Sequence, residues 1–493
     1  MDLQGLKEKI LQLAIQGKLV TQDPNDEPAS VLLERIRAER ERLIKEGKIK
    51  KQKQLPEITD EEKPFEIPEN WEWVRLGEVT IINPRNLFED EKQASFVPMA
   101  LIDEGFKNNH AFEVRLWKDI KKGFTHFAEN DVAVAKITPC FENRKSVIMR
   151  NLVNGIGAGT TELHIIRSIN ELVLPAYILI ICKTDRFIKD GISTYTGTAG
   201  QQRISKDFIM NYLIPLPPLA EQKRIVEKVN KLFALIDKLD SDKKELLEII
   251  NLTRNQVLQL AVQGKLIAQD PNDEPASVLL ERIRAERERL IKEGKMKKQK
   301  PLPEITDEEK PFEIPENWEW VRLGEVGAII GGGTPKTTVK EYWEGGTIPW
   351  ITPADLSNYK EKYISKGKRC ITPLGLKESS AQLMPKGTVL FSSRAPIGYT
   401  AIAKNEVSTN QGFKSCVPFI TDMSEFIYYY LTYSAKIIKE NASGTTFKEV
   451  SGTEVSSLIF PLPPLAEQKR IVEKVDIIMN MLDEAESELT AKV

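Results

Sequence analysis

Apolar residues recur every three or four positions in three stretches of the chain. In the middle of the sequence this spacing runs through Ile225, Val229, Leu232, Ile236, Leu239, Leu246, Ile250, Val257 and Leu260. It returns near the C-terminus at Ile471, Val475, Ile478, Leu482, Ala485 and Leu489, and near the N-terminus at Leu3, Leu6, Ile10 and Leu13. Steps that alternate between three and four predict helices that bury a narrow seam against another helix.

Much of the sequence is written twice. Residues 16–79 reappear at 263–326, and residues 215–229 return unaltered at 461–475. The only changes in the longer block are Val20/Ile267, Thr21/Ala268, Ile49/Met296 and Gln54/Pro301. Since the offset is half of the 493 residues, we predict that the two terminal helices together rebuild one central helix. We call the two unlike stretches insert 1 (80–214) and insert 2 (327–460), and the rest of the chain (1–79, 215–326 and 461–493), which contains the repeated segments, the frame.

The central helix, expected over about 220–262, would be about 65 Å long at 1.5 Å per residue. That length is close to two turns of duplex DNA at about 34 to 36 Å each. Because this helix leads from insert 1 to insert 2 and the terminal helices lead back, the two are predicted to be antiparallel. A constant frame with two different inserts indicates one protein with two binding specificities. The central helix would hold the two inserts at a fixed distance from each other.

A polar turn follows each long helix, at 23–28 and 270–275, and a short charged helix is expected behind it, over 29–46 and 276–293. Pro28 suits a helix start and Gly47 suits a C-terminal cap. The apolar stripe of this helix is thin, so much of it must face solvent or a partner. The lysines behind it, at 48–53 and 295–300, either neutralise phosphates or form a solvated helix tail.

Composition and charge place the chain among soluble globular proteins. It is 41% hydrophobic and 29% charged, and its net charge is −2. Insert 1 has 17 basic against 15 acidic residues and insert 2 has 15 against 11, which favours polyanions at the inserts and proteins at the frame. Four scattered cysteines, expected to be free, and the lack of a signal sequence indicate a cytoplasmic protein. The longest apolar run, 172–182, is too short to span a membrane and predicts a buried helix.

Two signatures frame each insert. An opening signature, PFEIPENWEWVRLGEV, stands before each insert, and a closing signature, PLPPLAEQKRIVEKV, begins about 140 residues later and leads into the heptad helix. The opening positions that carry the resemblance are Pro68, Trp71, Val74, Leu76 and Gly77, with their twins Pro315, Trp318, Val321, Leu323 and Gly324. This doubled arrangement resembles the specificity subunits of Type I restriction-modification systems, over essentially the whole chain.

The inserts also resemble the target-recognition domains of that family. Insert 2 carries matching motifs at 331–338, 389–398, 408–413 and 443–447, and insert 1 carries their counterparts at 131–146, 157–163 and 196–205. Insert 1 departs from the pattern at 82–86, where it has Ile-Asn-Pro-Arg-Asn in place of Gly-Gly-Gly-Thr-Pro. The loop there is expected to make different contacts from its counterpart, or none.

The resemblance implies an α/β fold with two target-recognition domains, separated by an antiparallel coiled coil of long helices with internal pseudo-two-fold symmetry. The implied domains are an N-terminal helical segment (1–63), target-recognition domain 1 (64–214), a central coiled-coil segment (215–310), target-recognition domain 2 (311–460) and a C-terminal helix (461–493). By resemblance, the chain binds double-stranded DNA at a bipartite, asymmetric target and has no catalysis of its own. It docks two methyltransferase subunits, which use S-adenosylmethionine, and restriction subunits, which use ATP and Mg, join them.

Base reading requires side chains that present paired donors or acceptors: Arg or Lys to guanine, Asn or Gln to adenine. In insert 1 the candidates on expected loops are Arg144, Lys145, Gln201, Gln202 and Arg203. In insert 2 they are Ser392, Ser393, Arg394, Asn410 and Gln411. The loops 331–338, with Lys336 as a point charge, and 196–200 are candidates to hold phosphates through backbone N–H groups, or are ordinary turns.

The sequence argues against base stacking by the tryptophans and against a phosphate loop or a metal site. Trp71, Trp73, Trp318 and Trp320 lie in the constant frame, so we interpret them as packing residues rather than base-stacking residues. A phosphate loop is excluded at 331–338 by Pro335 and by the missing spacer. The three histidines lie only in insert 1 and lack metal spacing, so neither a cofactor nor a metal is expected. Two alternatives stay open: a two-headed DNA-binding regulator without enzymatic partners, and a protein scaffold that does not bind DNA.

Overall fold

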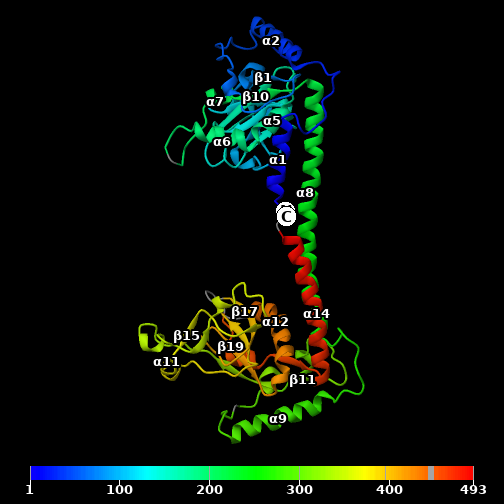
Figure 1. Cartoon of the computed structure of the whole chain (residues 1–493), viewed down its shortest axis with the longest axis vertical. Helices are drawn as coiled ribbons and strands as arrows, with labels where there is room; N and C mark the ends of the chain where they lie inside the picture. The colour runs from blue at the N-terminus through cyan, green and yellow to red at the C-terminus, as the bar shows by residue number, and fades with distance from the viewer. Residues whose placement is uncertain (1, 199, 299, 395, 442–448, 492–493) are drawn as a thin grey trace. The chain divides into compact units, whose positions relative to one another are not determined.

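The computed structural model describes residues 2–198, 200–298, 300–394, 396–441 and 449–491. Two compact units divide the chain at Lys243 and Lys244. Each unit contains one insert together with the frame segments on both sides of it. Figure 1 labels the main helices and strands of both units.

Unit 1 holds two four-stranded sheets, in the strand orders β2-β9-β6-β7 and β4-β3-β8-β5, and an antiparallel pair of β1 with β10. Its strands are β1 (Glu72–Arg75), β2 (Thr80–Ile82), β3 (Gln93–Val97), β4 (Glu113–Leu116), β5 (Thr125–Ala128), β6 (Val132–Ala135), β7 (Ser146–Ile148), β8 (Ile156–Gly159), β9 (Leu163–Ser168) and β10 (Leu213–Leu216). Its helices are α1 (Leu3–Ile15), α2 (Ala29–Lys45), α3 (Leu76–Val79), α4 (Trp117–Ile120), α5 (Pro175–Cys182), α6 (Asp185–Ser193), α7 (Lys206–Asn211) and the first part of α8 (Leu219–Val262).

Unit 2 holds a five-stranded sheet, β12-β19-β16-β17-β14, a three-stranded sheet, β15-β13-β18, and an antiparallel pair of β11 with β20. Its strands are β11 (Glu319–Arg322), β12 (Gly327–Gly331), β13 (Ile348–Ile351), β14 (Tyr363–Ile364), β15 (Arg369–Ile371), β16 (Val389–Ser393), β17 (Ile397–Ala403), β18 (Ser408–Thr409), β19 (Lys414–Pro418) and β20 (Ile459–Leu462). Beside the rest of α8, its helices are α9 (Ala276–Lys292), α10 (Leu323–Val326), α11 (Pro373–Lys377), α12 (Ser424–Asn441), α13 (Gly452–Ser456) and α14 (Leu465–Thr490).

The long helix α8 has an antiparallel partner within each unit, as the heptad spacing and the order of the segments along the chain together predict. In unit 1 the ammonium of Lys7 on α1 lies 2.5 Å from Asp237 on α8 and 5.1 Å from the ring of Phe233. In unit 2 the guanidinium of Arg254 on α8 lies 2.5 Å from Asp483 and 2.7 Å from Glu486 on α14. Figure 1 shows α1 beside the first part of α8 and α14 beside its last part. The prediction that the two terminal helices complete each other stays a prediction.

The predicted helices match the structure closely. The long helix begins at Leu219 and ends at Val262, and the short charged helices occupy Ala29–Lys45 and Ala276–Lys292. The apolar run at 172–182 forms the buried helix α5, which begins at Pro175 because proline is favoured in the first helical turn. All four cysteines are free thiols, as expected.

The opening and closing signatures meet in each unit around one buried carboxylate. In unit 1 Glu221 on α8 accepts a hydrogen bond from the indole of Trp71 at 2.8 Å and another from the amide of Gln22 at 2.6 Å. In unit 2 Glu467 on α14 accepts from Trp318 at 3.0 Å and from Gln269 at 2.7 Å. These indoles are buried, which confirms their interpretation as packing residues.

The other two tryptophans of the frame pack on phenylalanine rings. Trp73 lies 5.0 Å from Phe65 and Trp320 lies 5.1 Å from Phe312, measured between ring centroids. Both rings of each pair belong to the repeated sequence. The same local packing therefore recurs in both units.

Glu221→Ala is expected to destabilise unit 1 by about 2 kcal/mol or more, because two buried donors, the indole of Trp71 and the amide of Gln22, lose their acceptor. Thermal and urea unfolding of the full chain measures the effect. Glu227→Ala, an exposed change on the same helix, is the control and should be nearly neutral. Equal stability of the two variants would show that the carboxylate does not hold the signatures together.

Candidate nucleic-acid interface

Three loops of insert 1 meet at one edge of the sheet, beyond the end of β6. The backbone N–H of Lys136, directly after β6, donates to the carbonyl of Glu162 in the turn between β8 and β9, at 2.9 Å. The N–H of Ile204, in the segment before α7, donates to the carbonyl of Lys136 at 2.9 Å. A third bond, from Thr138 to Gln202 at 3.0 Å, extends the contact. We call this meeting point the loop junction of unit 1.

Unit 2 builds the same junction with the corresponding backbone groups. The N–H of Ser393, at the end of β16, donates to the carbonyl of Gly412 at 2.7 Å, and the N–H of Val450 donates to the carbonyl of Ser393 at 3.0 Å. The two hydrogen bonds of unit 1 thus recur, with Ser393 in the place of Lys136, Gly412 in the place of Glu162 and Val450 in the place of Ile204.

A fourth loop joins the junction of unit 2. The N–H of Gly333 donates to the carbonyl of Thr409 at 2.9 Å. Glycine is required beside it, since a Cβ on Gly332 would lie 1.9 Å from the carbonyl oxygen of Asn410. The hydroxyl of Thr334 bonds the side chain of Gln411. The glycine-rich motif therefore serves close packing of two loops, and it leaves Lys336 exposed next to them.

The two junctions differ in the side chains that they carry. In unit 1, two guanidinium nitrogens of Arg203 donate hydrogen bonds to the carboxylate of Glu162, at 2.8 and 3.1 Å. This contact lowers the pKa of the Glu162 carboxyl, so the pair stays ionised. In unit 2 the carboxylate of Glu449 lies 3.6 Å from both the guanidinium of Arg394 and the ammonium of Lys414. The two junctions thus share their backbone hydrogen bonds and differ in their charged side chains. Such a difference is expected of two domains that bind different sequences.

The structure brings one group of the predicted residues together at the junctions. In unit 1 these are Gln201, which is exposed, and Gln202 and Arg203, which are partly exposed. In unit 2 they are Arg394, Asn410 and the exposed Gln411, with Lys336 on the neighbouring loop. The side-chain oxygen of Asn410 accepts from the N–H of Gly412 at 2.9 Å, which fixes the turn. Whether any of them contacts DNA stays a prediction.

Other predicted residues have their polar atoms bonded within the protein. Ser392 is buried, donates to the carbonyl of Pro396 at 2.8 Å and accepts from the N–H of Tyr399 at 2.7 Å. Ser393 is buried and donates to the carbonyl of Gly412 at 3.2 Å. Their assignment as DNA contacts also stays a prediction, and the motif at 443–447 lies outside the described residues.

Arg144 and Lys145 lie on the segment after β6 but turn inward. The guanidinium of Arg144 donates to the carbonyl of Lys183 at 3.0 Å and pairs with Asp185, and the ammonium of Lys145 donates to the carbonyl of Met99 at 3.3 Å. Arg144 also lies 3.7 Å from Glu8 on α1. Arg144 therefore links insert 1 to the frame in this structure, and its role in base reading stays a prediction.

Sequence reasoning did not single out several residues of the junctions, notably Lys136, Glu162, Lys414 and Glu449. Glu162 stands within a motif that the sequence identifies, and its pairing with Arg203 could be suspected only from opposite charge. Glu449 has no local signal, because its partners Arg394 and Lys414 are distant in sequence.

A buried lysine lies beside Arg144 and offers a test of this contact region. The ammonium of Lys183 donates to the carbonyls of Gly105, at 2.6 Å, and Arg144, at 3.0 Å. Burial lowers the pKa of Lys183 to about 7. At pH values between this folded pKa and the ordinary lysine pKa, Lys183 carries a proton in the unfolded chain but not in the folded chain. The contribution of Lys183 to the free energy of unfolding is therefore present at high pH and is lost as the pH falls through the folded pKa.

The free energy of unfolding of the parent chain is expected to rise between pH 7 and pH 10, by up to about 1.4 kcal/mol per pH unit from Lys183. Lys183→Met removes this slope, whatever its effect on absolute stability. Urea unfolding at several pH values measures it, with the exposed Lys107→Met as the control. Identical slopes for the parent and Lys183→Met would contradict a depressed pKa at Lys183.

The histidines serve the fold of insert 1. Burial lowers the pKa of His164 to about 4, and its ring lies 3.2 Å from both the amide of Asn83 and the carbonyl of Ile204. Among the described residues, no group of three or more His, Cys, Asp or Glu is placed to hold a metal ion. Within the same part of the chain, no helix is long and apolar enough to cross a membrane.

A family model described as the Type I restriction modification DNA specificity domain matches residues 68–249 and 315–493. The specificity subunit of the Type I restriction enzyme EcoAI, from Escherichia coli, is 40% identical over 97% of this chain and 89% of its own length. The specificity subunit of EcoEI, also from Escherichia coli, is 48% identical over 68% of this chain and 64% of its own length.

Two solved structures share the fold. The HsdS subunit from Thermoanaerobacter tengcongensis is similar with a TM-score of 0.56 and 22% identity, over 87% of this chain and 94% of that chain. A chain from a study of complex assembly and conformational transition of the type I R-M system gives a TM-score of 0.61 and 23% identity, over 86% and 94%. At these identities the likeness establishes the fold.

Proposed function

We propose a function from one premise: the chain belongs to the family of Type I restriction-modification DNA specificity subunits. It recognises a bipartite, asymmetric DNA target, and each insert reads one half of it. The observation that carries this proposal is the pair of loop junctions, which share their backbone hydrogen bonds and differ in their charged side chains. The recognition domains are 64–214 and 311–460, each of which includes an opening signature of the frame, and the helical segments 1–63, 215–310 and 461–493 flank them.

The frame docks the enzymatic partners. Large apolar side chains of the frame helices that lie outside the heptad seam are exposed, at Leu235, Ile249, Leu252, Ile477 and Met481. Exposed apolar side chains on helices support a site for partner helices. Two methyltransferase subunits bind the frame, and restriction subunits join the complex. S-adenosylmethionine, ATP and Mg belong to those partners, and the chemistry takes place there rather than on this cytoplasmic chain.

Two alternatives can be separated from this function by experiment. A two-headed DNA-binding regulator would bind DNA selectively as the isolated chain and would not purify with a methyltransferase. A protein scaffold would bind its partners without a strong dependence on salt and would not bind DNA. No contact of the described residues favours either alternative over the specificity subunit.

The test is co-expression of the chain with the methyltransferase subunit of the same restriction-modification system. The two should purify together, and the complex should bind duplex DNA with an affinity that falls about 10³-fold or more between 50 and 200 mM salt, as expected for about six or more phosphate contacts. The isolated methyltransferase is the control and should bind without sequence preference. Failure of the chain to associate with the methyltransferase would contradict the proposal.

A further inference from the structure

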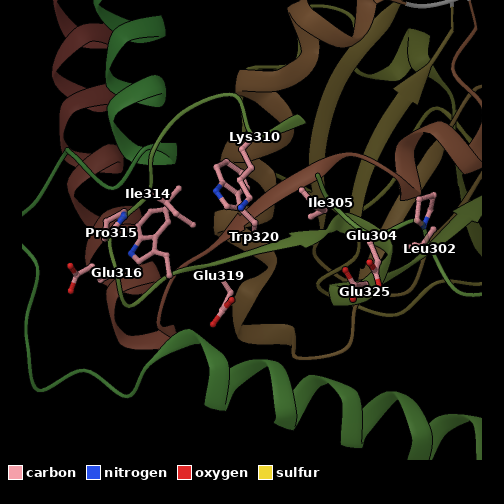
Figure 2. Close-up of a pocket in the computed structure, with 12 residues that line it drawn as sticks. Leu302, Glu304, Ile305, Lys310, Ile314, Pro315, Glu316, Glu319, Trp320 and Glu325 are labelled. Atoms are coloured by element: carbon pink, nitrogen blue, oxygen red, sulfur yellow. The ribbon is translucent and has the colours of Figure 1, made fainter. Parts of the chain in front are cut away.

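A cavity of about 570 Å³ lies in the frame of unit 2, beside strand β11. Figure 2 shows it between the strand and the chain segment that precedes it. Its lining comes entirely from repeated sequence: Leu302, Pro303, Glu304, Ile305, Lys310, Ile314, Pro315, Glu316, Trp318, Glu319, Trp320 and Glu325. We call it the frame pocket.

Buried contacts hold the walls of the frame pocket in place. The guanidinium of Arg322 donates to the carbonyls of Pro303, at 3.2 Å, and Glu304, at 3.1 Å, and pairs with Glu309 at 2.9 Å. The segment that carries Leu302 to Ile305 is therefore tied to β11. Trp320 forms an aromatic wall, supported by its contact with Phe312. The cavity is built by the fold and does not depend on an insert.

The frame pocket carries negative charge. Four carboxylates line it, at Glu304, Glu316, Glu319 and Glu325, against the single ammonium of Lys310. That ammonium lies 2.5 Å from Asp307, which already neutralises it. Such a surface repels the phosphates of DNA and attracts a cationic side chain, which the face of an indole also favours.

Unit 1 repeats the residues and the contacts that build the pocket. The lining residues have identical twins in the segment 55–78. Arg75 there donates to the carbonyls of Pro56, at 2.8 Å, and Glu57, at 3.2 Å, and pairs with Glu62 at 2.9 Å. One difference is that Glu78 pairs with Arg37, whereas Glu325 accepts from the backbone N–H of Arg322.

A surface whose lining residues are the same in both repeats, beside inserts that differ, suits one partner bound twice. We propose that the frame pocket and its twin each receive a basic, extended segment of a methyltransferase subunit, with a Lys or Arg side chain over Trp320 or Trp73. This assignment rests on the proposed function, since it names where on the frame each methyltransferase copy is held. It adds a polar anchor to the apolar docking of the frame helices.

The test compares charge variants of the full chain in binding to the methyltransferase subunit of the same restriction-modification system. The triple variant Glu304→Gln, Glu316→Gln, Glu319→Gln alters the frame pocket, and Glu57→Gln, Glu69→Gln, Glu72→Gln alters its twin. The control is Glu274→Gln, Glu281→Gln, Glu288→Gln, which removes the same charge from exposed positions at and near α9. Titration calorimetry gives affinity and stoichiometry, and the melting temperature of each variant shows that it is folded.

The parent and the control should bind two methyltransferase copies. Each triple variant should weaken one copy about tenfold and lower the salt dependence of its binding, since each exposed charge pair contributes modestly. Combining both triples should weaken both copies. If the parent binds two copies and all variants match it, the frame pocket assignment alone is wrong. If the parent binds none, the assignment falls together with the proposed function.

Discussion

Replacement of residues 327–460 with the corresponding insert of another family member is expected to change one half of the methylated DNA sequence and to leave the other half unaltered. The exchange is structurally feasible because insert 2 begins shortly after β11 and ends within its partner β20, where Glu319 lies opposite Leu462 and Arg322 opposite Ile459. The graft therefore begins and ends at a strand pair to which the frame contributes β11 and residues 461–462 of β20. Methylation at the original half-site should be lost entirely, which sequencing of methylated bases in cells detects.

The reciprocal exchange of residues 80–214 is the matched control. Insert 1 begins shortly after β1 and ends within β10, where Glu72 lies opposite Leu216 and Arg75 opposite Leu213. It should alter the other half of the target only. A graft in either insert that alters both halves would contradict independent reading by the two inserts.

Insertion of one heptad into α8 between Asp240 and Lys244 is expected to lengthen the unread spacer by about three base pairs. Seven helical residues add about 10 Å at 1.5 Å per residue, and one base pair rises about 3.4 Å. The antiparallel contacts of α8 flank this position, at Asp237 towards α1 and at Arg254 towards α14, so both should survive. A heptad also preserves the face of the helix. Mapping of methylated sites measures the spacer.

The same seven residues inserted after Lys50, in the exposed segment behind α2, provide the control for chain length. This variant should keep the original spacer and both halves of the target. If the insertion in α8 leaves the spacer unchanged, the length of α8 does not set the length of the spacer.

The frame could be predicted from the sequence because its information is local or repeated. Heptad spacing located α8 and α14, and the doubled blocks indicated that any contact in one unit would recur in the other. The pairing of Trp71 with Glu221 and of Trp318 with Glu467 follows this rule. The exact acceptor could not be predicted, since the partners lie about 150 residues apart and no periodicity links them.

The inserts were less predictable because their structure depends on non-local backbone pairing. Their strands are short, and β18 has only two residues, too few for a pattern of alternating burial. The conformation of Arg144 illustrates the difficulty. Its φ of 53° turns the chain so that the side chain meets Asp185 rather than solvent. A motif of charged residues on an expected loop carries no signal for that turn.

The most direct measurement of the central claim is a genome-wide map of methylated bases in cells with and without this chain, in the presence of its methyltransferase. The account predicts that one motif depends on the chain, and that it has two unlike halves separated by a spacer of constant length and variable sequence. An unchanged map, a continuous motif or a palindrome would contradict the claim that two different inserts on one repeated frame read a split target.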